Sequence, residues 1–120
     1  MFEDDYIMRQ VEITAAILSK IVFGKTLLSF KLPEEPDTYT GADRLYLTLL
    51  DLLAGGQINQ AENLLFDQAD VDDLRYLEVA IDFYLRLNRY DDEKLEELRY
   101  SREEINDGLR DIAAKFGITV

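Results

Sequence analysis

Residues 41–66 read GADRLYLTLLDLLAGGQINQAENLLF, and this stretch decides the fold. Apolar residues cover more than half of the helical circumference over 41–54, which is typical of a buried helix that should be central. The pair Gly55-Gly56 then ends the pattern, and residues 57–66 again show apolar residues at helical spacing. The stretch therefore predicts two antiparallel helices joined by a tight turn.

Three more helices are predicted after this hairpin, each from apolar residues that recur three or four positions apart. The first covers residues 71–88 with Asp70 as its N-cap, and a short helix covers 91–98. The last covers 101–116 and begins with an S-x-x-E capping box. Gly108 lies inside this last helix, where it predicts a close contact with another helix.

An amphipathic helix is predicted at the N-terminal end, over residues 4–23, with two apolar stripes. The inner face is expected to consist of Ile7, Val11, Thr14, Leu18 and Ile21, and the second stripe of Tyr6, Ile13 and Ile17. The second stripe is either covered by Leu27, Leu28 and Phe30 of the following loop or buried in a partner. We expect the second alternative, in which two copies of the chain form an isologous homodimer through Tyr6, Ile13 and Ile17.

The spacing Gly56-x4-Ala61 resembles the turn of a tetratricopeptide repeat (TPR), although any antiparallel helical array can produce such a coincidence. A shift by that repeat's length of about 34 residues pairs Leu50 with Tyr84. In a TPR-like array the first helix of each hairpin lines the concave side. Tyr46, Leu50 and Tyr84 are therefore candidate partner-binding residues, and the alternative is that all three belong to the core.

Three stretches show a further resemblance: FxxDYIMRxxE at residues 2–12, INQAENLLF at residues 58–66, and AIDFYxxLN at 80–88 followed by SREEIxxGL at 101–109. They are similar to a family of small uncharacterised bacterial proteins, mostly of Firmicutes, that is known as a domain of unknown function. The resemblance implies an all-helical, TPR-like body, and it implies no activity, cofactor or catalytic residue. We therefore expect a single all-α domain over 1–120: an N-terminal helix (1–24), a proline-containing loop (25–40) and a TPR-like array (41–120).

The composition argues against several classes of partner and chemistry. The 120 residues include 13 Lys+Arg and 25 Asp+Glu, a formal net charge of −12, which disfavours nucleic acid and anionic membrane surfaces. Because His and Cys are absent from the sequence, disulfides and the commonest zinc ligands are absent too. With no signal peptide or membrane-spanning pattern, we expect a cytoplasmic protein without a cofactor or metal.

Two motifs suggest chemistry, but each has a simpler structural explanation. Gly24-Lys25-Thr26 resembles the end of a P-loop, yet a helix precedes it and Ser19 replaces the required glycine, so it reads as a helix end. Asp70, Asp72 and Asp73 could bind a hard cation, but the glycine and glutamate of an EF-hand are missing, and a helix N-cap explains them.

The sequence therefore predicts a non-catalytic protein-interaction or scaffolding module that self-associates. The alternative is a small-ligand binder or an enzyme with a pocket between the helices, because constellations such as Tyr–Lys or Asp–Arg leave no sequence pattern.

Overall fold

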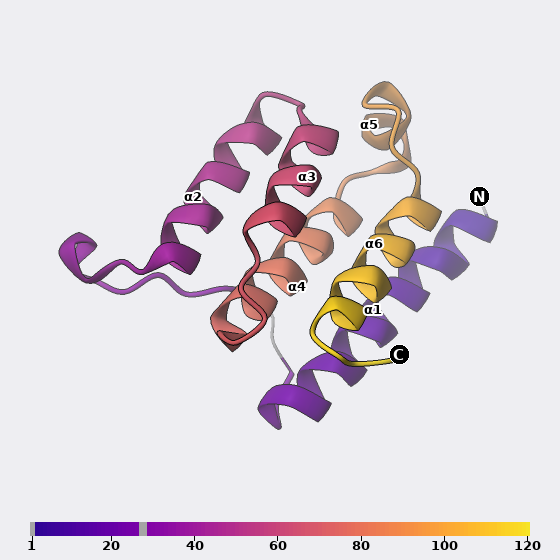
Figure 1. Cartoon of the computed structure of the whole chain (residues 1–120). Coiled ribbons are helices and arrows are strands. Elements are labelled where there is room, and N and C mark those ends of the chain that lie inside the picture. Colours follow the sequence, from indigo (N-terminus) through magenta and orange to yellow (C-terminus); the bar gives the residue numbers. More distant parts are fainter. Residues whose placement is uncertain (1, 27–28) are drawn as a thin grey trace.

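The computed structural model describes the backbone of residues 2–26 and 29–120, and the side chains of residues 5–26 and 29–120. Across these ranges the chain forms six α-helices and a 3₁₀ turn and contains no strand, which confirms the predicted all-helical fold (Figure 1). The elements are α1 (Phe2–Phe23), η1 (Pro36–Thr38), α2 (Gly41–Ala54), α3 (Ile58–Gln68), α4 (Leu74–Asn88), α5 (Asp92–Glu97) and α6 (Arg102–Lys115). Within the described ranges, no helix combines the length and the apolar character needed to cross a membrane.

Side chains close a capping box at the start of α2 and the predicted one at the start of α6. The backbone N–H of Thr40 donates to Asp43 Oδ2 at 2.8 Å at the start of α2, and the N–H of Ser101 donates to Glu104 Oε2 at 2.8 Å at the start of α6. Each bond satisfies a backbone donor that a helix leaves without an intrahelical partner. The positions of these two helix starts are therefore encoded locally in the sequence.

The start of α4 differs from the prediction. The helix begins at Leu74, and its N-cap is Asp73, whose side chain accepts from the backbone N–H of Arg75 at 3.0 Å. Asp70, the predicted cap, accepts instead from the N–H of Asp72 at 2.9 Å and closes a separate turn. Because an aspartate can stabilise a turn as well as a helix start, three nearby aspartates left the boundary ambiguous.

Helix α4 is the central helix, and the prediction that the first helix of the 41–66 hairpin is central was wrong. Helix α4 packs against α1, α2 and α6, whereas the main neighbours of α2 are α3 and α4. Figure 1 shows the α2–α3 hairpin on one side of α4 and the α1–α6 pair on the other. The buried apolar residues of α4 surround most of its circumference: Leu77, Val79, Ala80, Ile81, Phe83, Tyr84 and Leu87.

The repeat interpretation fits one hairpin better than the other. Helices α2 and α4, the first helices of the two predicted repeats, contact each other directly. The expected counterpart of α3 is α5, which ends after six residues. Arg99, at a positive φ of 57°, then redirects the chain into α6. A TPR-like arrangement therefore stays an interpretation of an all-helical array.

The buried face of α1 is rotated from the predicted one. Val11 and Leu18 are fully buried as expected, but Ile21 is 62% exposed. Ala15 and Ser19 are buried instead, and the Ser19 hydroxyl donates to the Ala15 carbonyl at 2.7 Å, so its burial leaves no unpaired polar group. These small side chains are on the face that α1 presents to α4 and α6, and Ile21 is turned toward solvent.

Candidate functional site

The outer face of α1 carries an exposed apolar stripe. It consists of Tyr6, Ile13, Ile17 and Ile21, with exposed fractions of 70%, 44%, 48% and 62%. Spacings of seven, four and four residues place the four side chains along one side of the helix. They are four of the seven large apolar side chains that the described part of the chain exposes, so the stripe concentrates exposed apolar surface on one element.

Exposed charges flank the stripe with opposite signs at its two ends. Asp5 and Glu12 lie in the N-terminal half of the helix, with Arg9 between them. Lys20 is in the last turn of α1, and Lys25 follows the helix end. This order matches the helix macrodipole, which favours negative charge near the N-terminus and positive charge near the C-terminus.

The loop does not cover this stripe through Phe30, as one of the two alternatives required. Phe30 is buried, and its ring lies 4.8 Å from the ring of Tyr46 on α2 and beneath the guanidinium of Arg75 on α4. Leu27 and Leu28, the other residues that could cover the stripe, lie outside the described residues. The structure thus keeps Tyr6, Ile13 and Ile17 as candidates for self-association and adds Ile21.

The candidate partner-binding residues do not form an open surface. Tyr84 is fully buried and Tyr46 is 7% exposed, while Leu50 is half-buried against the same core. For the two tyrosines the structure supports the alternative that they are core residues. The hypothesis of a partner site is corrected for Tyr84, because its ring is enclosed by α4's neighbours and cannot reach another molecule.

Tyr84 is part of a cluster that links three segments of the chain. Its hydroxyl donates to Glu62 Oε2 of α3 at 2.5 Å, and the Tyr100 hydroxyl donates to the same oxygen at 2.9 Å. Burial, followed by the negative charge of Glu62, raises the pKa of both phenols well above the usual value. Both phenols therefore stay protonated and act as hydrogen-bond donors that hold the segments together.

Gly108 of α6 packs directly against this cluster, which confirms the predicted close contact. A Cβ atom at this position would lie 2.5 Å from the Tyr84 hydroxyl oxygen and 2.6 Å from Glu62 Oε2. Real side chains do not tolerate such distances, so any larger residue has to displace α6 or break the hydrogen bond.

Gly108→Ala is expected to lower the free energy of unfolding by about 1–3 kcal/mol, the usual range for overpacking, despite a helix-propensity gain of about 1 kcal/mol. Urea denaturation followed by circular dichroism measures the change. Gly55→Ala is the matched control, because its added Cβ would meet no atom closer than 3.6 Å. A Gly108→Ala protein as stable as the wild type would show that the helices do not need this close approach.

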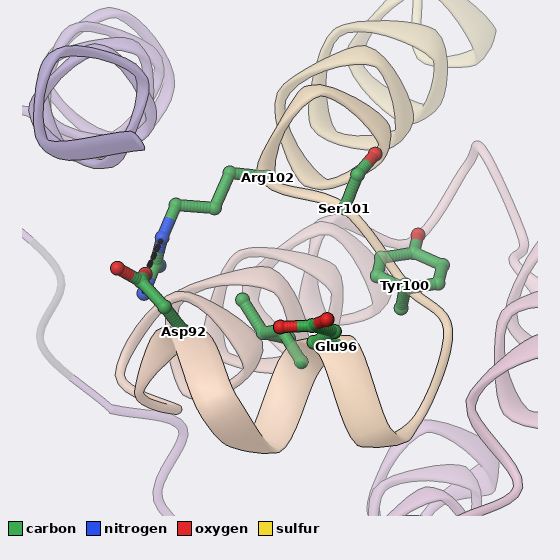
Figure 2. A pocket seen from close by; sticks show the side chains of 6 residues that line it. Asp92, Glu96, Tyr100, Ser101 and Arg102 are labelled. Atoms are coloured by element: carbon green, nitrogen blue, oxygen red, sulfur yellow. Dashed lines mark hydrogen bonds and ion pairs between the residues drawn. The ribbon is translucent and has the colours of Figure 1, made fainter. Parts of the chain in front are cut away.

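A shallow pocket of about 260 Å³ opens between α5 and α6 (Figure 2). Its lining residues are Asp92, Leu95, Glu96, Tyr100, Ser101 and Arg102. In Figure 2 the Arg102 side chain points toward Asp92, and its Nη2 donates to Asp92 Oδ1 at 2.9 Å. The same guanidinium donates to the backbone carbonyls of Asn88 at 2.9 Å and of Tyr90 at 2.8 Å. Arg102 thus connects the end of α4 to the starts of α5 and α6, and these bonds occupy its donors.

A polar cluster between α2 and α4 was not predicted from the sequence. The Asp82 carboxylate, buried on α4, pairs with Arg86 at 3.3 Å, and Arg86 Nη2 donates to the Tyr46 hydroxyl at 2.9 Å. Burial, followed by the charge of Asp82, raises the pKa of the Tyr46 phenol. A signal was present in the sequence, because Asp82 interrupts the apolar run AIDFY of a helix that is otherwise buried at that point.

Among the described residues, no group of three or more His, Cys, Asp or Glu side chains is arranged to hold a metal ion.

Residues 1–117 match the model of a protein family that is described as a family of unknown function (DUF6483). The match includes every described helix, and it confirms the resemblance to a domain of unknown function. No curated protein and no solved structure matches the chain. The bacterial origin of the family stays a prediction.

Proposed function

Since the chain belongs to this family of unknown function, we propose from the geometry that it is a non-catalytic interaction module that associates with a second copy of itself through the outer face of α1. The observation that carries the proposal is the exposed stripe of Tyr6, Ile13, Ile17 and Ile21. A contiguous exposed apolar patch marks an interaction surface more often than scattered apolar residues do. The helix has 22 residues, and a helix of that length spans about 33 Å, so the stripe offers a long contact line.

The charges beside the stripe favour a second copy as the partner. In an antiparallel pairing that sets Ile13 against Ile17 of the second copy, Asp5 comes near the end of that copy's helix, which Lys25 follows. The two-fold axis repeats both contacts, as an isologous interface requires. The macrodipoles of the two helices also run in opposite directions in this arrangement, which is the favourable orientation.

The pocket beside Arg102 gives little support to the alternative of a ligand binder or an enzyme. The pocket beside Arg102 is shallow, and its arginine is used to connect three helices. The cytoplasmic location stays a prediction from the sequence. The expectation that neither nucleic acid nor a membrane is a partner stays a prediction from the formal charge of −12.

In sedimentation equilibrium, the wild type is expected to behave as a dimer of its 13.9 kDa chain and the double variant Ile13→Glu/Ile17→Glu as a monomer. The reason is that the interface would place these isoleucines in its apolar centre, where two pairs of unpartnered carboxylates cannot be buried. Circular dichroism should show the same helix content for both proteins, because both side chains are about half exposed in the single chain.

The matched control is Val71→Glu/Leu74→Glu, which also adds two carboxylates, at side chains that are 45% and 47% exposed and do not belong to α1. This variant should remain a dimer. A monomeric wild type, or a folded Ile13→Glu/Ile17→Glu variant that stays dimeric, would contradict the proposal.

A further inference from the structure

The segment Ser29–Leu32, which we term the strap, crosses the α2–α4 face without forming a helix or a strand. Phe30 is buried, and Leu32 is partly buried against the same core. The ring lies 4.8 Å from that of Tyr46 and is tilted by 44°, and the Arg75 guanidinium carbon is 4.3 Å from the ring centroid. The Phe30 ring is therefore enclosed between the Tyr46 ring of α2 and the Arg75 guanidinium of α4.

The same face also recognises the backbone of the strap. The N–H of Phe30 donates to Asp82 Oδ2 at 2.7 Å, and Arg75 Nη2 reaches the Lys31 carbonyl at 3.5 Å. A carboxylate that accepts a backbone N–H and an arginine that donates to the next carbonyl fix an extended chain in one direction. Neither bond depends on the identity of the strap's other side chains, so the face can hold any extended segment with an aromatic anchor.

The receiving groups are held by partners other than the strap. Asp82 pairs with Arg86, and Arg86 donates to the Tyr46 hydroxyl. Arg75 pairs with Asp43, which is itself buried at the start of α2. Because the Arg86–Tyr46 and Arg75–Asp43 contacts join α4 to α2 directly, we expect the arrangement to persist when the strap detaches. Arg75 also pairs with Glu78 at 3.6 Å, so the receiving groups are two arginines and three carboxylates.

We propose that the α2–α4 face is a recognition site for an extended segment of another protein with an aromatic anchor, and that the strap occupies this site in cis. The strap is held by the buried Phe30 and the partly buried Leu32, so a partner segment has to displace both side chains. A partner segment then competes with a tethered one, whose effective concentration is in the millimolar range for a short tether. This site is distinct from the α1 stripe and does not depend on self-association.

The test uses the full-length Phe30→Ala variant and a fluorescein-labelled peptide of residues 29–36, SFKLPEEP, in fluorescence anisotropy. The variant should bind the peptide, because its own strap no longer fills the site. The wild type should bind it at least about tenfold more weakly, since the apparent affinity falls with the fraction of chains in which the strap has left the site empty. The same peptide with F30A should not bind.

A second substitution tests the site itself. Adding Arg75→Ala to the Phe30→Ala variant should weaken peptide binding about tenfold, because the cation over the ring and the donor to the Lys31 carbonyl are lost. Arg44→Ala is the matched control, because Arg44 is an exposed arginine of α2 whose side chain donates to the Tyr39 carbonyl. It should leave binding unchanged.

Failure of the folded Phe30→Ala variant to bind the peptide would overturn the proposal. If that variant does not fold, Phe30→Leu takes its place, and loss of folding in both would also overturn it, since a face that needs the strap to form cannot receive a partner. The Phe30→Ala chain can also be mixed with a chain that keeps Phe30, with Ile13→Glu/Ile17→Glu in both. Dimers in that mixture would contradict the proposal, because the site would then receive the strap of a second copy.

Discussion

Tyr84→Ala is expected to lower the free energy of unfolding by about 3–5 kcal/mol, the range for truncating a large buried aromatic residue. Tyr84 is fully buried in the central helix, and its ring packs edge-on against Phe83 with centroids 5.0 Å apart. The substitution leaves a cavity between α4 and α6 and removes a hydrogen bond to Glu62. Urea denaturation monitored by circular dichroism measures the loss.

Tyr84→Phe separates the ring from the hydroxyl. It keeps the packing and removes one of the two phenols that donate to Glu62, so the expected loss is about 1 kcal/mol. A Tyr84→Ala protein within 1 kcal/mol of the wild type would show that the ring is not part of the core. The partner-binding hypothesis for Tyr84 would then have to be reopened.

Arg102→Ala is expected to cost about 3–5 kcal/mol, because it removes hydrogen bonds from a charged donor to two backbone carbonyls, each contributing about 1.5–3 kcal/mol. The Asp92 side chain is half exposed, so the ion pair itself contributes little of this. The larger part comes from the carbonyls of Asn88 and Tyr90, which lose a charged donor on the buried side of the joint between α4 and α6. The Asn88 side chain also donates to the Met8 carbonyl, so α1 should loosen as well.

The matched control for Arg102 is Arg110→Ala on the same helix. Arg110 is exposed and donates to the carbonyl of Val120, so its loss should change stability by no more than about 0.5 kcal/mol. Thermal or urea unfolding of both variants gives the comparison. Equal effects of the two substitutions would mean that the buried network does not hold the helices together.

Much of the secondary structure is written in short sequence signals. The capping boxes at Thr40 and Ser101 and the glycine at 24, with its positive φ of 71°, each act within one helical turn. Where one turn offers two solutions, as with Asp70 and Asp73 before α4, the local signal was ambiguous. The stripe of Tyr6, Ile13 and Ile17 was predictable because a helix has two sides and the sequence gives both of them apolar residues.

The packing order and the sites between helices could not be predicted in the same way. Periodicity shows that a helix has an apolar face, but it does not show which neighbour covers that face or how far the helix rotates to fit small residues such as Ala15.

By itself, the sequence determined that this protein is all-helical, where most of its helices begin and end, and that its first helix has a surplus apolar stripe. These properties depend on residues within a few positions of each other. The tertiary structure alone decided that α4 is central, that Ile21 joins the stripe, and that Phe30 and Asp82 meet although 52 positions separate them. Contacts over such distances arise from the packing of whole helices, because that packing brings together side chains that share no local pattern.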